Sequence, residues 1–371
     1  MIIKRLIFSL FLLLSVTTTM FGQSRDLNIF GYYQINYTNF DVSVNGQKGL
    51  EVNSFLMQQM NVFLQKNHNT EFSSFINLEF TNSFSFQDTI GGFKIEEAWL
   101  KYSPSSYFNV KGGVLVPRFN NFNEIKNRTV LLPYIYRPIA YETYFFTQFG
   151  TGEFVPTSAN LQIYGDVPAG KFRLNYAVFY GNSQPALLND NNDRWGSGQD
   201  ATPYKMVGGR VGVEYDNLQF GVSATYDRSD LRDYDIGYIP RTRFGAYLNY
   251  SLARFELEAE LIKVYYDLSQ ADKNTLALNP FNPQEFDKEF YHVNLLYYVT
   301  DELSAYVGYD LLKGGENIFI AEGLNFYNVG VSYLVTDSII LKAQYEHQVY
   351  PKFSGTEAIR NDYLLGASIS F

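Results

Sequence analysis

The sequence contains no cysteine, three histidines and two tryptophans among its 371 residues. Without cysteine there are no disulfides and no thiolate metal ligands, and three histidines leave little for a zinc enzyme or a histidine relay. Charged residues make up only 18%, but 31 Tyr and 32 Phe exclude a disordered chain. The length allows either two soluble domains or one long all-β barrel.

Residues 1–22 have the form of a secretory signal peptide. Lys4 and Arg5 form a basic start, an apolar run of eleven residues follows, and Gly22 offers a small residue at the cleavage site. A membrane anchor, the alternative, needs about 20 apolar residues, and three consecutive threonines end the run too early. We therefore expect export and cleavage before Gln23. Loss of the two basic residues changes the net charge from −9 to −11, so no nucleic acid is expected as a partner.

The rest of the sequence has no run apolar enough for a membrane helix, and its dominant pattern is alternation with period two. From Phe172 to Tyr180 the even positions are apolar or aromatic, whereas the odd positions include Arg173 and Asn175. Successive side chains of a strand point to opposite faces, so such a segment has one apolar and one mixed face. Similar segments predict sixteen strands, at 27–40, 53–66, 70–84, 94–103, 107–117, 158–167, 170–181, 205–215, 218–229, 240–251, 253–267, 287–300, 302–313, 323–336, 338–350 and 362–371.

The connections between these segments alternate between short and long. The short ones carry turn residues, for example Pro168-Ala169-Gly170 and Asp216-Asn217. The long ones are 41–52, 85–93, 118–157, 182–204, 230–239, 268–286, 314–322 and 351–361. A soluble sandwich has no reason to sort its connections in this way, whereas outer-membrane barrels have short periplasmic turns and longer extracellular loops. The pattern predicts an all-β, transmembrane, antiparallel up-and-down β-barrel of about 16 strands, spanning 23–371.

Strand length and aromatic placement agree with this prediction. Most segments have 10–15 residues, enough for a tilted bilayer crossing of about 9–11 residues. Tyr and Phe gather near strand ends, as at Tyr265 and Tyr266, where they suit the interfacial girdles of membrane barrels. The plainer alternative is that tyrosine simply favours β-structure.

Four segments carry a resemblance to a known family. The C-terminal segment 363–371 alternates and ends in Phe371, like the strand by which outer-membrane barrels are recognised for assembly, and it is joined by 30–37, 95–102 and 112–119. Together they resemble Gram-negative outer-membrane porins of the Bacteroidota type, related to the phosphate-selective porin group. The resemblance implies the cell outer membrane, contact with outer-membrane lipid, and passive diffusion of small hydrophilic solutes or ions. It also suggests a homotrimer, which the sequence itself does not specify.

For such a protein the functional residues are those that line the pore. A barrel of about 16 strands leaves an aqueous channel, so inward positions must tolerate water and can carry charge. The strand phases predict as pore lining Arg210, Arg241, Arg243, Glu256, Glu258 and Glu260. Other inward candidates are Glu97, Lys101, Arg173, Glu214, Asp310, Lys342 and Glu346. The arginines and glutamates lie on nearby strands, so they could form a charge-segregated wall; the alternative is that they form ion pairs within a wet lumen.

The connection 118–157 is the third long loop and far exceeds the usual length. It includes apolar stretches, such as Val130-Leu131-Leu132 and Tyr144-Phe145-Phe146, that need a surface to pack on. In the porins that this chain resembles, the third loop folds into the barrel and narrows it. We therefore expect a pore constriction formed by Arg118, Glu124, Lys126, Arg128, Arg137, Glu142 and Glu153. Otherwise the loop caps the outer mouth or packs against a neighbouring subunit.

Other chemistries have weak support. The Asp- and Asn-rich run in loop 182–204 departs from EF-hand spacing, which favours a solvated loop over a calcium site. His68, His292 and His347 lie far apart in the sequence, and no nucleophile elbow or zinc motif is present. We expect no enzyme, no metal and no cofactor, although a hydrolase with a lone rim histidine would have to use His347.

Two functions remain open at this point. The leading one is an outer-membrane porin. The alternative is a structural or accessory barrel, plugged by its own loops, in a larger outer-membrane complex for secretion, assembly or motility. Loops 118–157 and 182–204 could plug a pore or contact such protein partners equally well. The basic residues of the third loop hint at anions, but the acidic net charge leaves selectivity open.

Overall fold

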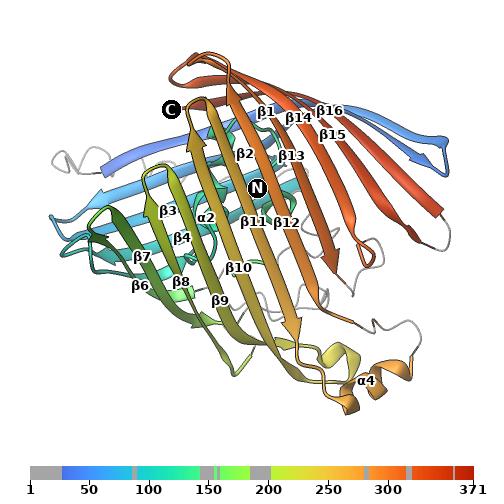
Figure 1. The fold of residues 1–371 in the computed structure, drawn as a ribbon, viewed down its shortest axis with the longest axis horizontal. Coiled ribbons are helices and arrows are strands. Elements are labelled where there is room, and N and C mark those ends of the chain that lie inside the picture. The colour runs from blue at the N-terminus through green and yellow to red at the C-terminus, as the bar shows by residue number, and fades with distance from the viewer. Residues whose placement is uncertain are drawn as a thin grey trace, which may run out of the picture.

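The chain forms one closed antiparallel β-barrel (Figure 1). The computed structural model describes residues 27–85, 90–142, 154–156, 159–183, 202–279, 283, 285–314, 320–353 and 356–371. Each strand pairs with its neighbours in the chain, and β1 pairs with β16 to close the ring. This confirms the predicted fold and strand number. The strands are β1 (Leu27–Val44), β2 (Gln47–Asn67), β3 (Phe72–Ser85), β4 (Ile90–Tyr102), β5 (Asn109–Leu115), β6 (Ala159–Ala169), β7 (Phe172–Asn182), β8 (Lys205–Tyr215), β9 (Leu218–Asp230), β10 (Tyr238–Leu252), β11 (Phe255–Tyr266), β12 (Lys288–Tyr298), β13 (Leu303–Gly314), β14 (Leu324–Thr336), β15 (Ile339–Phe353) and β16 (Thr356–Ser370).

The alternation of side chains separates an apolar exterior from a mixed interior. In β9, Val222 and Tyr226 are about half exposed, at 51% and 47%, on the outer face. Ser223, Thr225 and Asp227 alternate with them and are buried inside the barrel. Because side chains of a strand alternate between the two faces, the period-two pattern of the sequence places the apolar set outside, the reverse of a soluble barrel.

One end of the barrel, here the short-turn end, joins the strands by turns of two to six residues. These turns are 68–71, 103–108, 170–171, 216–217, 253–254, 299–302 and 337–338. The opposite end, here the long-loop end, carries the longer connections. Among these, the β11–β12 connection contains α4 (Gln270–Ala277), and the β9–β10 connection contains η6 (Arg232–Tyr234). No helix in the described part of the chain is long and apolar enough to cross a membrane.

Three of the connections predicted to be long are shorter, because the flanking strands extend into them, so those predicted loop lengths are wrong. β1 and β2 continue through 41–52 to a turn at Asn45 and Gly46, both with positive φ, at 49° and 75°. An Asn-Gly pair with these angles closes a two-residue hairpin. Strands β15 and β16 extend to Phe353 and Thr356 within the predicted loop 351–361, and β3 and β4 extend to Ser85 and Ile90 within 85–93, while residues 354–355 and 86–89 lie outside the described residues. The alternating apolar signal ends before the hydrogen-bonded ladder does, because backbone pairing does not require apolar side chains.

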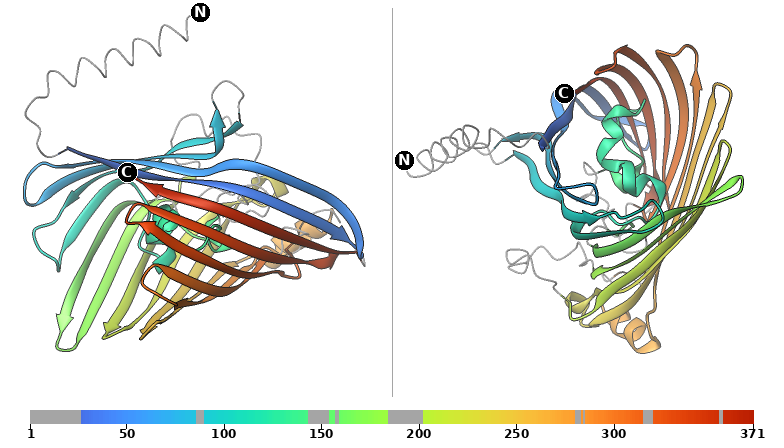
Figure 2. Two further views of the ribbon diagram at one scale, coloured as in Figure 1. Left: turned by 90° about the horizontal axis from the view of Figure 1, so that it is seen from above. Right: turned by 90° about the vertical axis from the view of Figure 1, so that its left-hand side faces the viewer.

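The third long connection enters the barrel. Its longer described part, residues 116–142, is called the inner loop below, and it contains α2 (Asn121–Ile125), η1 (Lys126–Leu131) and η2 (Ile139–Tyr141). Figure 2 shows its helical turns inside the ring of strands rather than above the rim. The inner loop therefore determines how much of the lumen stays open.

Candidate functional site

One carboxylate on β11 holds both ends of the inner loop. Glu260 accepts a hydrogen bond from the backbone N–H of Phe122 at 2.7 Å and from the hydroxyl of Tyr141 at 2.5 Å. The side-chain amide of Asn120 also lies 3.5 Å from this carboxylate and donates to the Leu261 carbonyl at 3.2 Å. Hydrogen bonds to a buried carboxylate are stronger than those between neutral groups. They fix α2 and η2 against the same strand.

The wall also provides space for this contact. Gly245 on β10 faces inward, and a Cβ atom at this position would lie 2.3 Å from the side-chain oxygen of Asn120 and 2.9 Å from Phe119. On β9, the hydroxyl of Ser223 donates to the Phe119 carbonyl. A glycine and a small serine on adjacent strands thus let the backbone of the inner loop approach the wall closely.

The middle of the inner loop is bonded to a separate part of the wall. Lys342 on β15 donates to the backbone carbonyls of Val130 and Tyr134, at 2.6 and 3.2 Å. Gln344 on the same strand accepts from the backbone N–H of Ile135 at 2.8 Å, and Gln34 on β1 donates to the Ile135 carbonyl at 3.0 Å. Contacts to β11 and, farther round the barrel, to β15 and β1 mean that the inner loop extends across part of the lumen.

Two buried ion pairs add to this attachment. Lys126 lies 3.1 Å from Glu96 of β4, and Arg137 lies 3.6 Å from Glu142 while donating to the Lys126 carbonyl at 3.0 Å. Burial acts to lower the pKa of Arg137, but the carboxylates of Glu142 and Glu79 outweigh it and raise that pKa above its ordinary value. Arg137 therefore stays charged, and its pairing holds the two halves of the inner loop together.

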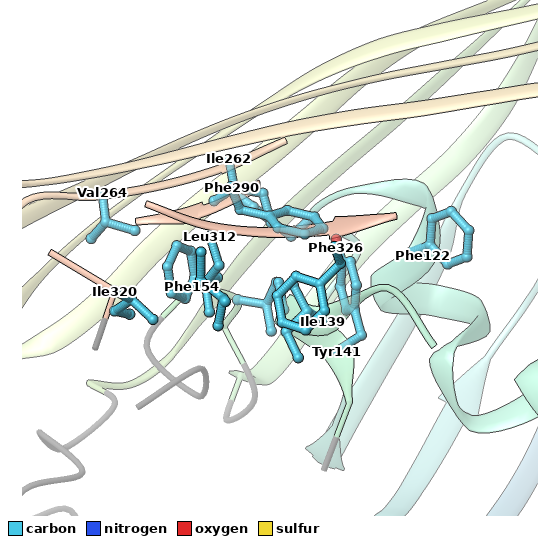
Figure 3. Close-up of a cluster of buried hydrophobic side chains, with 14 of the residues drawn as sticks. Phe122, Ile139, Tyr141, Phe154, Ile262, Val264, Phe290, Leu312, Ile320 and Phe326 are labelled. Atoms are coloured by element: carbon cyan, nitrogen blue, oxygen red, sulfur yellow. The ribbon is translucent and has the colours of Figure 1, made fainter. Parts of the chain in front are cut away.

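One side of the lumen is filled by apolar packing (Figure 3). Phe122, Ile139 and Tyr141 of the inner loop pack against inward-facing side chains of the wall. The wall residues of this cluster on β11, β12, β13 and β14 are Ile262, Val264, Tyr266, Phe290, Leu296, Tyr306, Leu312, Leu324 and Phe326. The expectation that inward positions are water-lined is wrong for this part of the wall, because the inner loop covers it and removes it from water.

Open space lies on the other side, between the inner loop and strands β2 to β5. A cavity of about 450 Å³, here the β2–β5 cavity, is lined from these strands by Phe63, Gln65, Phe75, Glu97, Trp99 and Lys111, and from the inner loop by Val116, Arg118, Asn121, Glu124, Ile125 and Arg128. A second cavity of about 560 Å³ at the short-turn end shares Gln65 with it and includes His68 and Lys101. These two cavities thus lie on the β2–β5 side of the inner loop, and charged and polar side chains form much of their lining.

The structure places the predicted constriction residues in two groups. Arg118, Glu124 and Arg128 line the β2–β5 cavity, and Arg118 pairs with Glu124 at 2.7 Å. Lys126, Arg137 and Glu142 are buried in the ion pairs described above. Glu153 lies outside the described residues. That these residues narrow a pore stays a prediction.

The predicted lining residues are separated along the barrel axis. Arg241 and Arg243 lie toward the long-loop end of β10, fully buried, and both bind Asp227 of β9, at 2.6 and 3.3 Å. On β11, Glu256 lies near the short-turn end, followed by Glu258 and Glu260. Arg210 on β8 pairs with Glu124 of the inner loop. The two β10 arginines thus have the geometry of the wall ion pairs that the sequence left as an alternative.

The residues that the sequence analysis missed are the inward apolar ones. Ile262 and Val264 occupy the same face of β11 as Glu258 and Glu260, and Phe290 lies on the same face of β12 as His292. In the sequence, the change from glutamate to Ile and Val along one face of β11 is the feature that could have identified these residues. It shows where a strand stops facing water and meets another part of the chain.

The remaining candidates do not come together. His68 bonds Ser74 near the β2–β3 turn, His292 bonds Asp310 inside the barrel, and His347 bonds Asn361 of β16. The described residues contain no group of three or more His, Asp and Glu side chains placed to hold a metal ion. Most of loop 182–204, with its Asp- and Asn-rich run, lies outside the described residues.

Comparison with known proteins finds similarity at the level of the fold. No family model and no curated protein matches the chain. Among solved structures, OmpF of Salmonella typhi in complex with daunomycin is similar with a TM-score of 0.60 at 15% identity, over 93% of this chain and 97% of that one. The outer membrane channel DcaP of Acinetobacter baumannii gives 0.59 at 13%, over 93% and 97%. A trimer form of OmpT from Vibrio cholerae gives 0.53 at 13%, over 93% and 99%.

Proposed function

We propose that this chain is a channel of the Gram-negative outer membrane through which small hydrophilic solutes or ions diffuse passively. The observation that carries the proposal is the reversed polarity of the barrel: apolar side chains face outward, while charged side chains and a cavity of about 450 Å³ lie inside. An apolar exterior of this kind suits lipid, and a polar interior suits water. Similarity to the fold of OmpF and of the channel DcaP adds support.

In this proposal the inner loop forms the constriction. It is bonded to β11, β15 and β1, and in this proposal solutes pass it through the β2–β5 cavity. Arg118, Glu124 and Arg128 then face the passing solute, whereas Lys126, Arg137 and Glu142 keep the inner loop in place. The electrostatic potential around the constriction is then set by the charged residues of the wall, namely Arg210, Arg241, Arg243, Glu256, Glu258 and Glu260.

Single-channel recording tests this function. Purified protein is inserted into a planar bilayer, and the conductance and the reversal potential across a potassium chloride gradient are measured. Stable openings support a pore, and the sign of the reversal potential shows which charges dominate its narrowest part. A folded protein that gives no openings contradicts the proposal.

A second function has one specific observation in its favour. The apolar packing of the inner loop against β11 to β14 occupies part of the lumen, as expected for a plugged accessory barrel in a larger outer-membrane complex. Such a barrel would be silent in the bilayer and would be purified from native membranes together with its protein partners. Openings with no associated protein favour the channel.

Several finer expectations belong to the same proposal. We place the protein in the cell outer membrane after cleavage before Gln23, which mass spectrometry of the mature protein tests. Membership of a Bacteroidota group related to phosphate-selective porins, and the absence of enzymatic activity, remain part of the proposal. So does a homotrimer, which is supported by the trimer form of OmpT and tested by native mass spectrometry.

A further inference from the structure

The β2–β5 cavity has the composition of a binding site rather than of a plain water channel. Its volume of about 450 Å³ falls within the usual range for small-molecule sites. It combines two kinds of surface, a row of aromatic rings on the wall and a group of cationic side chains around it.

The aromatic row crosses three neighbouring strands. The rings of Phe63 on β2 and Phe75 on β3 lie 5.5 Å apart with an interplanar angle of 25°, and those of Phe75 and Trp99 on β4 lie 5.1 Å apart at 24°. Phe75 and Trp99 are direct cross-strand partners, which holds their rings in register. All three rings line the cavity and give it one continuous apolar side.

The carboxylates of the cavity are already engaged. Glu97 accepts the indole N–H of Trp99 at 3.1 Å. Glu124 binds Arg118 at 2.7 Å on one side and Arg210 on the other. The indole N–H is neutral, so Glu97 keeps its negative charge, but in the described part of the chain neither carboxylate forms a direct ion pair with Lys111 or Lys101.

Three cationic groups keep donors available. Lys111 has its ammonium 4.5 Å from the ring centre of Trp99 and 5.9 Å from that of Tyr164, but it has no hydrogen-bond acceptor among the described residues. Within the same described part of the chain, Arg128 in the cavity and Lys101 in the adjoining one also have no hydrogen bond or ion pair. The guanidinium of Arg118 stacks on Tyr164 at 4.0 Å. The cavity thus combines surplus positive charge with an apolar side.

We infer that the β2–β5 cavity binds small anions that carry an apolar ring, with aromatic carboxylates as the matching class. The carboxylate meets Lys111 and Arg128, the two cations that line the cavity and keep free donors, and the ring packs against the side formed by Phe63 and Phe75. A charged hydrogen bond and apolar contact in the same cavity select a solute that has both features. This inference deepens the proposed function by naming a solute class, and so it rests on that function.

Tryptophan fluorescence tests the site without requiring an open pore. The chain has two tryptophans, so the variant W195F leaves Trp99 in the cavity as the only reporter. Sodium benzoate is titrated into this protein in detergent, with sodium acetate, benzyl alcohol and inorganic phosphate as comparison probes. We expect saturable binding of benzoate that is about tenfold tighter than that of the other three. Equal binding of acetate or tighter binding of phosphate overturns the inference, because the aromatic side would then contribute nothing.

Two matched lysine variants test whether Lys111 is the cation that binds the carboxylate of benzoate. K111M, made in the W195F protein, should weaken benzoate binding about tenfold. K171M removes an exposed lysine from the β6–β7 turn and should leave binding unchanged. Equal effects of the two variants overturn the inference. Heat-dependent mobility on gels confirms that both variants are folded.

Conductance separates this inference from the proposed function. If the protein conducts, benzoate should block the potassium chloride current at the concentrations that saturate the fluorescence. A conducting protein without benzoate binding overturns the site and leaves the channel. A silent protein that binds benzoate with the expected K111M effect supports the site and overturns the channel.

Discussion

The carboxylate of Glu260 accepts the backbone N–H of Phe122 at 2.7 Å, so a side chain of the barrel wall holds the first turn of the only α-helix in the described part of the inner loop. The same carboxylate receives the Tyr141 hydroxyl from the other end of that loop. One residue therefore joins two points 19 positions apart in the sequence to β11. The position of the inner loop depends strongly on this residue.

Replacing this residue should loosen the inner loop. In E260A the backbone N–H of Phe122 and the hydroxyl of Tyr141 lose their acceptor, at a cost of about 1–3 kcal/mol for each buried group left without one. We expect larger conductance and more current noise in planar-bilayer recordings. The matched control is E256A on the same face of β11, where the carboxylate bonds Tyr298 and not the inner loop. Equal traces for the two variants would contradict the role of Glu260.

A larger side chain at Gly245 should displace the inner loop from the wall. In G245L the new side chain meets Asn120 and Phe119, where a Cβ alone would come within 2.3 Å of the Asn120 oxygen. Overpacking of this kind costs about 1–3 kcal/mol, and the inner loop is the part that can move. We expect a raised conductance together with a barrel that remains folded. A246L, on the neighbouring outward position of β10, is the control and should leave the conductance at the wild-type value.

The strands could be predicted from the sequence, and the resemblance to porins implied a third loop inside the barrel, but the contacts of individual inward side chains could not be predicted. A barrel strand has an apolar and a mixed face along its whole length, so β7 and β9 are visible as period-two segments. The tip of the β1–β2 hairpin carries no such alternation, and only the Asn45-Gly46 turn marks it. Alternation shows which side chains point inward, but not what they contact. Glu260 and Ile262 share the inward face of β11, yet Glu260 bonds the backbone of the inner loop and Ile262 belongs to the apolar cluster.

The buried ion pair on β9 and β10 should be important for stability. Asp227 binds Arg241 and Arg243 inside the barrel, and all three side chains are fully buried. Removing one partner of a buried pair typically costs about 3–5 kcal/mol. D227N should therefore lower the free energy of unfolding by this amount in urea titrations of protein in lipid vesicles. E51Q breaks the exposed Lys48–Glu51 pair and should cost less than about 1 kcal/mol. Similar losses in the two variants would show that Asp227 has no special structural role.

A charge introduced on the apolar exterior should cost more stability near the middle of the barrel than near its rim. Val222 lies outward near the middle of β9, where its partners are Val211 and Ala246. If a bilayer surrounds this band, V222R brings a guanidinium into its apolar interior at a cost of about 2–4 kcal/mol.

The matched control is V44R at the tip of the β1–β2 hairpin, where Val44 is 40% exposed next to the Asn45-Gly46 turn. There the cost should fall to about 0–1 kcal/mol, because the arginine reaches water or lipid head groups. Urea unfolding in vesicles of defined lipid measures both variants. The difference between them should disappear in a detergent micelle that is thin enough for the arginine of V222R to reach water. A difference that persists there would point instead to packing around Val222 as its cause.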